Sequence, residues 1–278
     1  MRMLFTALLF LALPVHAGTI QWQQVLHSEL RDSQVHCSMK LSQTGDDLAR
    51  AVSVDWEFAG EKESSRSDRD YLPGTVVHTD TAIFQRPALP GWYPVIARLN
   101  YADANGYPFS SILVHLQSVD TPPPLRFLIE PAGLTLSRTG ATSVRVKYAG
   151  DSDVEVTCRV VAPVELDVTE PKSALKLHFR PGQELVIPIG MGTGGALPGT
   201  RTTVYIIMEG EQGGIHEVGM GTIQVNVVKP DEGNMEWKIA ALAVLAISLA
   251  LLLQPILRRR KKDWISILKK NRNLETNS

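Results

Sequence analysis

Apolar and polar residues alternate with a period of two along most of the chain before position 230. The alternation is clearest in five segments: 35–41, 52–58, 93–101, 144–148 and 154–160. Such alternation is typical of strands with one buried and one solvated face, and none of this stretch shows a helical stripe. The pattern therefore predicts an all-β chain.

Turn signals separate the expected strands at short intervals. Glycine, proline, asparagine and aspartate gather at 44–47, 72–74, 90–91 and 105–106 in the first half of the chain. These residue types terminate strands and favour tight turns. Short strands joined by regular turns, without helices, predict a β-sandwich.

The tetrapeptide Ala-Leu-Pro-Gly occurs twice, at 88–91 and 196–199, an offset of 108 positions. At the same offset Asn105-Gly106 corresponds to Gly213-Gly214, and both pairs suit a two-residue hairpin turn. The repeat predicts two copies of one β module. We expect domains at 18–120 and 125–229, joined by a stiff linker at 121–124, where three consecutive prolines cannot continue a strand ladder.

The turn motifs resemble those of bacterial immunoglobulin-like modules, in particular CARDB-type domains and the alpha-galactosidase-associated NEW domains. The motifs are Ala149-Gly150-Asp151-Ser152-Asp153, Phe179-Arg180-Pro181-Gly182-Gln183 and Leu197-Pro198-Gly199-Thr200 in the second half, and Pro90-Gly91-Trp92-Tyr93 in the first. The resemblance implies two tandem immunoglobulin-like β-sandwich domains with an accessory role. It transfers no catalytic residues.

The N-terminal residues 1–17 read as a secretory signal peptide. Arg2 precedes an apolar run at 4–13, and Ala17 is a small residue at the expected cleavage position. An uncleaved anchor is the alternative, although this run is short for a bilayer that needs about 20 residues.

A second apolar run, at 237–257, predicts one C-terminal transmembrane helix. Trp237 stands where interfacial aromatics are favoured, and five consecutive cations follow the run: Arg258, Arg259, Arg260, Lys261 and Lys262. By the positive-inside rule these cations place the tail 258–278 in the cytoplasm. A short linker at 230–236 would join the span to the domains.

The formal net charge of −1 conceals an acidic exported part and a basic tail. The tail carries +6 and the exported part −9. An acidic surface disfavours nucleic-acid binding, which depends on cations that neutralise phosphates. The expected partners are the membrane, another envelope protein and, as an alternative, a glycan.

The two cysteines, Cys37 and Cys158, fall one in each expected domain. A small secreted chain that relies on disulfides would carry more of them. Two interpretations stay open: buried small apolar residues, or an inter-domain or inter-subunit disulfide.

Candidate catalytic and metal-binding patterns are weak. The glycine-rich segment 190–195 precedes a strand and not the helix that a phosphate loop needs. The acidic segment 151–155 favours a turn over a calcium site, and the sequence has neither zinc-type histidine spacing nor a Gly-x-Ser-x-Gly elbow. We expect the protein to be no enzyme and to bind no metal or cofactor. The alternative is a hydrolase whose site is dispersed over several strands.

Two sets of residues are candidate contacts for a partner. Trp92 and Tyr93 could line a carbohydrate face, and Arg66, Asp68 and Arg69 belong to the charged segment 61–70, which we expect to be a loop. Asn-x-Ser/Thr sequons are absent, which favours a bacterial origin.

The sequence thus predicts a non-catalytic binding or scaffolding protein anchored in the bacterial inner membrane, its domains in the periplasm or outside. A carbohydrate-binding accessory protein is the alternative.

Overall fold

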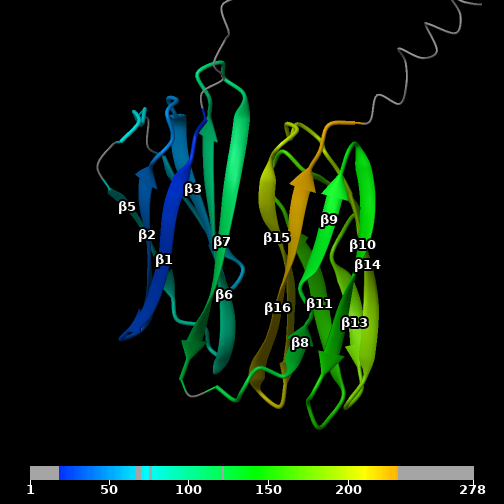
Figure 1. The fold of residues 1–278 in the computed structure, drawn as a ribbon. Helices are drawn as coiled ribbons and strands as arrows, with labels where there is room; N and C mark the ends of the chain where they lie inside the picture. The colour runs from blue at the N-terminus through cyan, green and yellow to red at the C-terminus, as the bar shows by residue number, and fades with distance from the viewer. Residues whose placement is uncertain (1–18, 67–69, 75–76, 121, 231–278) are drawn as a thin grey trace, which may run out of the picture. The chain divides into compact units, whose positions relative to one another are not determined.

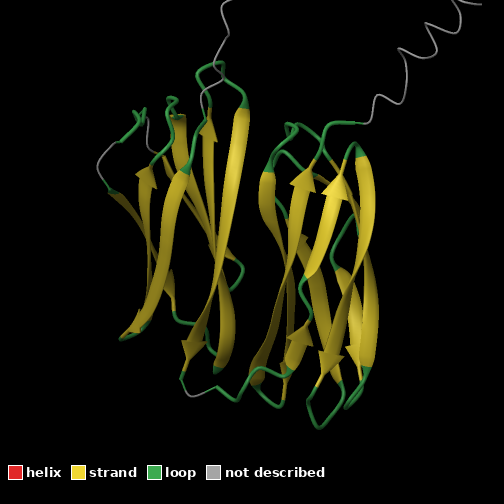
Figure 2. Cartoon of the chain, viewed as in Figure 1, coloured by secondary structure: helices red, strands yellow, loops and turns green. Residues whose placement is uncertain are grey.

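The computed structural model describes residues 19–66, 70–74, 77–120 and 122–230. Within these ranges the chain forms strands and no helix, so the all-β prediction is confirmed there (Figure 2). No described helix is long and apolar enough to cross a bilayer. The expected signal peptide 1–17, span 237–257 and tail 258–278, including Trp237 and the cations at 258–262, lie outside the described residues.

The first β-sandwich consists of seven strands (Figure 1). A three-stranded sheet in the order β1-β2-β5 packs on the order β4-β3-β6-β7, and every pairing within these two sheets is antiparallel. The strands are β1 (Trp22–Arg31), β2 (Gln34–Gln43), β3 (Arg50–Phe58), β4 (Glu61–Arg66), β5 (His78–Gln85), β6 (Gly91–Ala102) and β7 (Pro108–Val119).

The second β-sandwich is built from the remaining nine strands (Figure 1). An outer sheet β12-β14-β10-β8 packs on an inner sheet β13-β11-β15-β16-β9, in which β9 runs parallel to β16. The strands are β8 (Phe127–Ile129), β9 (Ala132–Leu136), β10 (Thr139–Tyr148), β11 (Val154–Val161), β12 (Asp167–Glu170), β13 (Leu175–Phe179), β14 (Glu184–Gly192), β15 (Arg201–Gln212) and β16 (Ile215–Val227).

Each sandwich has its own apolar core. Trp56 and Phe58 lie in the first, and Tyr148 and Phe179 in the second. The indole of Trp56 is buried and donates to Asp80 Oδ1 at 2.8 Å. The alternating residues of the sequence therefore face these cores, as a period of two requires.

Cys37 belongs to the first core and Cys158 to the second, and both thiols are free. Burial raises the pKa of Cys37 to about 12, with a smaller contribution from Glu63, and raises that of Cys158 to about 11. Of the two interpretations left open by the sequence, the structure shows buried apolar residues. Such thiols are poor nucleophiles at neutral pH.

A third apolar cluster lies between the two sandwiches. It is formed by side chains of β6 and β7 on one side and of β11, β15 and β16 on the other: Ile96, Ile112, Val161, Ile207 and Val218. Strands β6 and β15 are consequently buried on both faces. The described residues up to Lys229 belong to one compact unit.

The inner sheets of the two sandwiches join at one point. Gly91, the first residue of β6, pairs in parallel with His216 of β16, and the His216 N–H donates to Pro90 O at 2.9 Å. An idealised Cβ at Gly91 would lie 2.2 Å from His216 O, and its φ is +151°. Only glycine permits this approach, because any other residue places a carbon there.

The repeated motif leads into β6 in the first sandwich, where Gly91 is the first residue of the strand, and into β15 in the second, where Gly199 lies two positions before the strand begins. Its last residue behaves differently in each copy, since an idealised Cβ at Gly199 meets nothing within 4 Å.

The hairpins that follow the motif also differ between the two copies. Gly213-Gly214 forms the expected two-residue turn, whereas the expected turn at Asn105-Gly106 is part of a longer loop between Ala102 and Pro108. Asp103 stabilises that longer loop by accepting the N–H groups of Asn105 and Tyr107 at 2.9 Å each.

Candidate functional site

Tyr93 lies at the junction of the two sandwiches. Its side chain is 5% exposed, and its ring stacks on that of His216 with a centroid distance of 4.0 Å and an interplanar angle of 7°. The hydroxyl donates to Leu89 O at 2.9 Å. Burial, with the nearby charges of Glu211 and Glu209, raises the pKa of Tyr93 to about 12. This tyrosine therefore packs the junction as a neutral ring.

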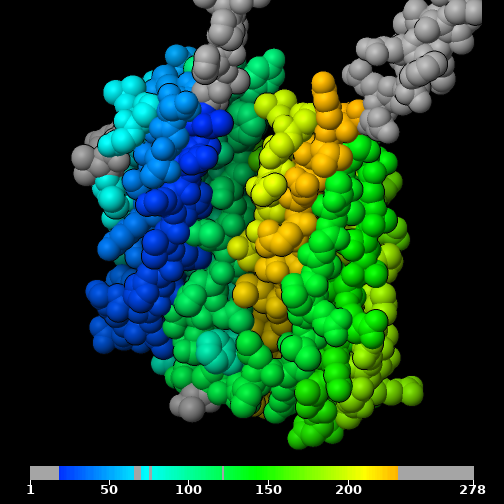
Figure 3. Space-filling view, viewed as in Figure 1, coloured from blue at the N-terminus to red at the C-terminus, as the bar shows by residue number. Residues whose placement is uncertain are grey.

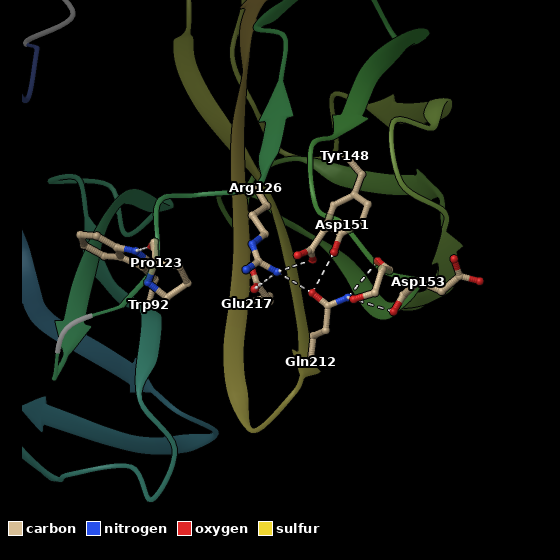
Figure 4. Close-up of polar contacts among 9 residues, drawn as sticks. Trp92, Pro123, Arg126, Tyr148, Asp151, Asp153, Gln212 and Glu217 are labelled. Carbon is tan, nitrogen blue, oxygen red and sulfur yellow. Dashed lines mark hydrogen bonds and ion pairs between the residues drawn. The ribbon is translucent and has the colours of Figure 1, made fainter.

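Trp92 is half-buried beside Tyr93 and packs against the apolar cluster between the sandwiches. Its indole N–H donates to Pro123 O, in the segment that connects β7 to β8, at 2.9 Å (Figure 4). Carbohydrate binding by Trp92 and Tyr93 stays a prediction. The contacts of both rings give them a packing role at the junction.

The charged segment predicted as a loop begins as an edge strand. Arg66 is the last residue of β4, whose residues 61–64 are exposed, while Asp68 and Arg69 lie outside the described residues. Strand β4 pairs with β3 on one side. A partner contact at this segment stays a prediction.

A buried carboxylate links the sandwiches at one end of the junction. Glu165, in the β11–β12 loop, accepts the backbone N–H of Ser110 at 3.0 Å and the Ser110 hydroxyl at 3.3 Å. The same hydroxyl oxygen accepts the N–H of Val164 at 2.8 Å. Burial raises the pKa of Glu165, and the bonds from Ser110 and the charge of Arg98 offset the rise only in part.

Stability should therefore depend on pH through Glu165. Because its folded pKa lies above the unfolded value of about 4.3, the folded state holds the proton more tightly, and the destabilising contribution is fully present once pH exceeds the folded pKa. We expect Glu165→Gln, whose amide oxygen can still accept the Ser110 N–H, to remove this contribution. The free energy of unfolding between pH 4 and 8 should then fall less with rising pH than in the wild type.

The exposed Glu130 serves as the control for this measurement, because it lies in the short connection between β8 and β9, where its side chain is 60% exposed and 3.4 Å from the similarly exposed Arg145. Glu130→Gln should leave the pH profile of stability unchanged. A Glu165→Gln profile that overlays the wild type would contradict the assignment of the pH dependence to the buried carboxylate.

A charged network links the sandwiches at the opposite end of the junction. The guanidinium of Arg159, on β11, donates to Glu57 of β3 and, at 3.1 Å, to Glu209 of β15. Glu209 also lies 3.8 Å from His216 Nε2, while His216 Nδ1 is 2.6 Å from Trp92 O. Arg159 is partly buried, which strengthens its hydrogen bonds relative to those of surface pairs.

The sequence contains a signal for this interface that alternation alone misses. The runs 94–97 and 204–208 are continuously apolar, and their residues on both faces of β6 and β15 are buried or half-buried. A continuous apolar run indicates a strand that is covered on both sides.

A polar cluster orders the loops at the linker end, by which we mean the end where β7 finishes and β8 begins (Figure 4). Arg126 donates to Gln212 Oε1 at 2.7 Å and lies 3.3 Å from the buried carboxylate of Glu217 and 3.6 Å from Asp151. The Tyr148 hydroxyl donates to the same Gln212 oxygen at 3.0 Å. Burial raises the pKa of Glu217, and the charge of Arg126 opposes the rise.

The amide of Gln212 fixes the β10–β11 loop. Its nitrogen donates to Ser152 O at 2.8 Å, to Ser152 Oγ at 2.7 Å and to Asp153 O at 3.0 Å. The acidic segment is thus a turn held by side-chain bonds, and within the described ranges no group of three or more His, Cys, Asp or Glu side chains could hold a metal. This arrangement leaves Asp151 87% exposed.

The start of the connecting segment is fixed in the same manner. One guanidinium nitrogen of Arg86 lies 2.6 Å and 2.7 Å from the two carboxylate oxygens of Asp120, the last described residue before Pro122. We call Arg86, Asp120, Asp151 and Asp153, with the loops that carry them, the linker-end surface. It combines exposed charge with a constrained backbone, the usual character of a recognition surface.

The comparisons with known proteins find only distant structural similarity. No family model and no curated protein matches the chain. An ASH / PapD-like domain of human CEP192 matches at 11% identity and a TM-score of 0.28, covering 41% of this chain and 94% of that one. A Porphyromonas gingivalis W83 protein of unknown function matches at 9% identity and a TM-score of 0.33, covering 74% and 99%.

The E. coli alpha-2-macroglobulin in its native conformation matches at 12% identity and a TM-score of 0.29, and the match covers 74% of this chain and 17% of that one. At this level of similarity the comparisons carry no functional argument. They give no support to the CARDB type in particular. What the strand pairings show is an architecture of two β-sandwiches.

Proposed function

We propose that this protein is a non-catalytic binding or scaffolding protein of the bacterial envelope, anchored in the membrane through 237–257. The observation that supports this function best is the junction between the sandwiches. An apolar cluster, a buried carboxylate and a charged network all join the two modules. The protein therefore offers a partner one preformed two-module body.

A preformed body suits protein recognition for an energetic reason. Binding is weakened when loops and domains must be ordered on association, and interfaces that are ordered beforehand avoid much of this loss. At the linker end, Gln212 and Arg126 have already ordered the loops by hydrogen bonds. The arrangement favours recognition over chemistry.

We propose the linker-end surface as the contact region. Asp151 and Asp153 are exposed at 87% and 56%, and the exported part of the chain is acidic overall. Charge complementarity mainly sets association rates and partner choice, so an acidic surface fits a partner with a basic face. The charged segment that contains Arg66, Asp68 and Arg69 stays a second predicted contact.

The experiment is crosslinking of the full-length protein in native membranes, with a photoreactive residue at Ser152. We expect one reproducible protein adduct. Asp151→Asn combined with Asp153→Asn should reduce its yield roughly threefold to tenfold at low salt, and added salt should reduce the wild-type yield, as screening of exposed charges requires. Glu130→Gln, at an exposed acid in the connection between β8 and β9, is the matched control and should have no effect. Membranes that yield no reproducible protein adduct would contradict the proposal.

A further inference from the structure

The end of the body opposite the linker carries exposed apolar side chains on loops of both sandwiches. Tyr107, in the β6–β7 loop, is 65% exposed; Val164, in the β11–β12 loop, is 50% exposed; and Leu197, in the β14–β15 loop, is 57% exposed. We call these three residues the apolar end. Strand β16, drawn in orange, finishes at this end (Figure 3).

Hydrogen bonds donated by backbone N–H groups hold the three loops together. Val164 N–H donates to Ser110 Oγ, just after Tyr107 in sequence, at 2.8 Å. Ala196 N–H, next to Leu197, donates to Glu165 O at 3.0 Å. Gly199 N–H donates to Val227 O at 2.7 Å, which connects this group of loops to the end of β16. The apolar side chains thus project from one ordered surface that spans both sandwiches.

The two ends of the body differ in the kind of side chain that they expose. The linker end presents charged groups such as Arg86, Asp120 and Asp151, and its exposed apolar side chains, Leu125 and Leu128, belong to one short stretch at the start of the second sandwich. At the other end, apolar tips of three loops lie at the same end of the body as the last residues of β16. Clusters of exposed apolar residues on soluble surfaces usually mark interaction sites.

We propose that the apolar end rests on the bilayer, with Tyr107, Val164 and Leu197 contacting the membrane–water interface. The inference depends on the proposed anchoring by 237–257. The seven residues 230–236 span at most about 25 Å when fully extended, so the last described residues of β16 cannot lie far from an anchored span. Tyrosine and aliphatic side chains at loop tips suit this zone, where an apolar body and a polar tip are both satisfied.

The contact we infer is shallow, because Asp103 lies just behind Tyr107. Its carboxylate accepts hydrogen bonds from the N–H groups of Asn105 and Tyr107. Only the side chains at the tips would therefore enter the interface, while the carboxylate stays among headgroups and water. Such a contact would also turn the linker-end surface toward a partner.

The test uses the full-length protein reconstituted in phosphatidylcholine vesicles that contain a doxyl-labelled quencher lipid. Single cysteines at Tyr107→Cys, Val164→Cys and Leu197→Cys receive an environment-sensitive fluorophore, and Leu125→Cys is the matched exposed control. The native thiols are buried with raised pKa values and should stay unlabelled in the folded protein. We expect quenching at the three apolar-end sites to exceed that at Leu125→Cys at least twofold, with blue-shifted emission.

Flotation with the vesicles and resistance to carbonate extraction are measured in parallel. If the protein floats and resists extraction but all four labels are quenched alike, membrane contact by the apolar end is refuted while the anchoring stands. If the protein does not float, the proposed anchoring fails and this inference fails with it.

Discussion

Replacement of Gly91 by alanine should divide the unfolding of this protein into two transitions. In the wild type we expect one cooperative transition, because the sandwiches share a buried cluster and a strand pairing. The alanine Cβ would lie 2.2 Å from His216 O and 2.8 Å from His216 Cβ, at a φ of +151°. Steric overlap and backbone strain together should destabilise the junction by about 2–5 kcal/mol.

The measurement is denaturant unfolding of the full-length protein in detergent, followed by tryptophan fluorescence and by far-UV circular dichroism. Gly199→Ala is a control supplied by the repeat itself. Gly199 also has a positive φ, +95°, but its added Cβ meets nothing within 4 Å. It should share the conformational penalty of about 1–2 kcal/mol and keep the single transition. Equal profiles for the two variants would contradict a role for the close approach of β6 and β16.

The fold was largely predictable from the sequence because local rules determine it. Clear alternation identified five of the sixteen described strands (β2, β3, β6, β10 and β11), and turn residues such as Pro-Gly and Gly-Gly identified strand ends. The residues that alternate, such as Trp56 and Cys158, do lie in the cores. The longer β6–β7 loop escaped prediction because Asp103, two residues upstream of Asn105, caps it through side-chain bonds that no dipeptide rule describes.

The junction was less predictable because its contacts join residues far apart in the chain. Arg159 and Glu57 are 102 positions apart, and neither stands in a recognisable motif. Trp92 and Tyr93 were named as candidate contact residues. The partners that determine their packing, Pro123 and His216, could be found only in three dimensions. The apolar runs at 94–97 and 204–208 indicated burial on both faces but did not say what covers them.

The second large effect is expected at Ile207, which faces the first sandwich from β15. Its side chain is fully buried with Ile96, Ile112 and Val218, although it lies on the face of β15 opposite the core of its own sandwich. Ile207→Ala should reduce the free energy of unfolding by about 2–5 kcal/mol, the range for a large-to-small substitution in a packed interior. An isolated second sandwich would leave this position in water, and the substitution would then change stability little.

Ile206 provides the matched comparison, since it is the neighbouring residue of the same type, is equally buried, and belongs to the core of the second sandwich. Ile206→Ala should destabilise that sandwich whether or not the junction is formed. The decisive experiment is therefore a double-mutant cycle with Gly91→Ala. Once that substitution has opened the junction, Ile207→Ala should lose most of its effect and Ile206→Ala should keep it. Additive behaviour of Ile207→Ala with Gly91→Ala would mean that the cluster and the strand pairing act independently, and that the two sandwiches are not coupled as one body.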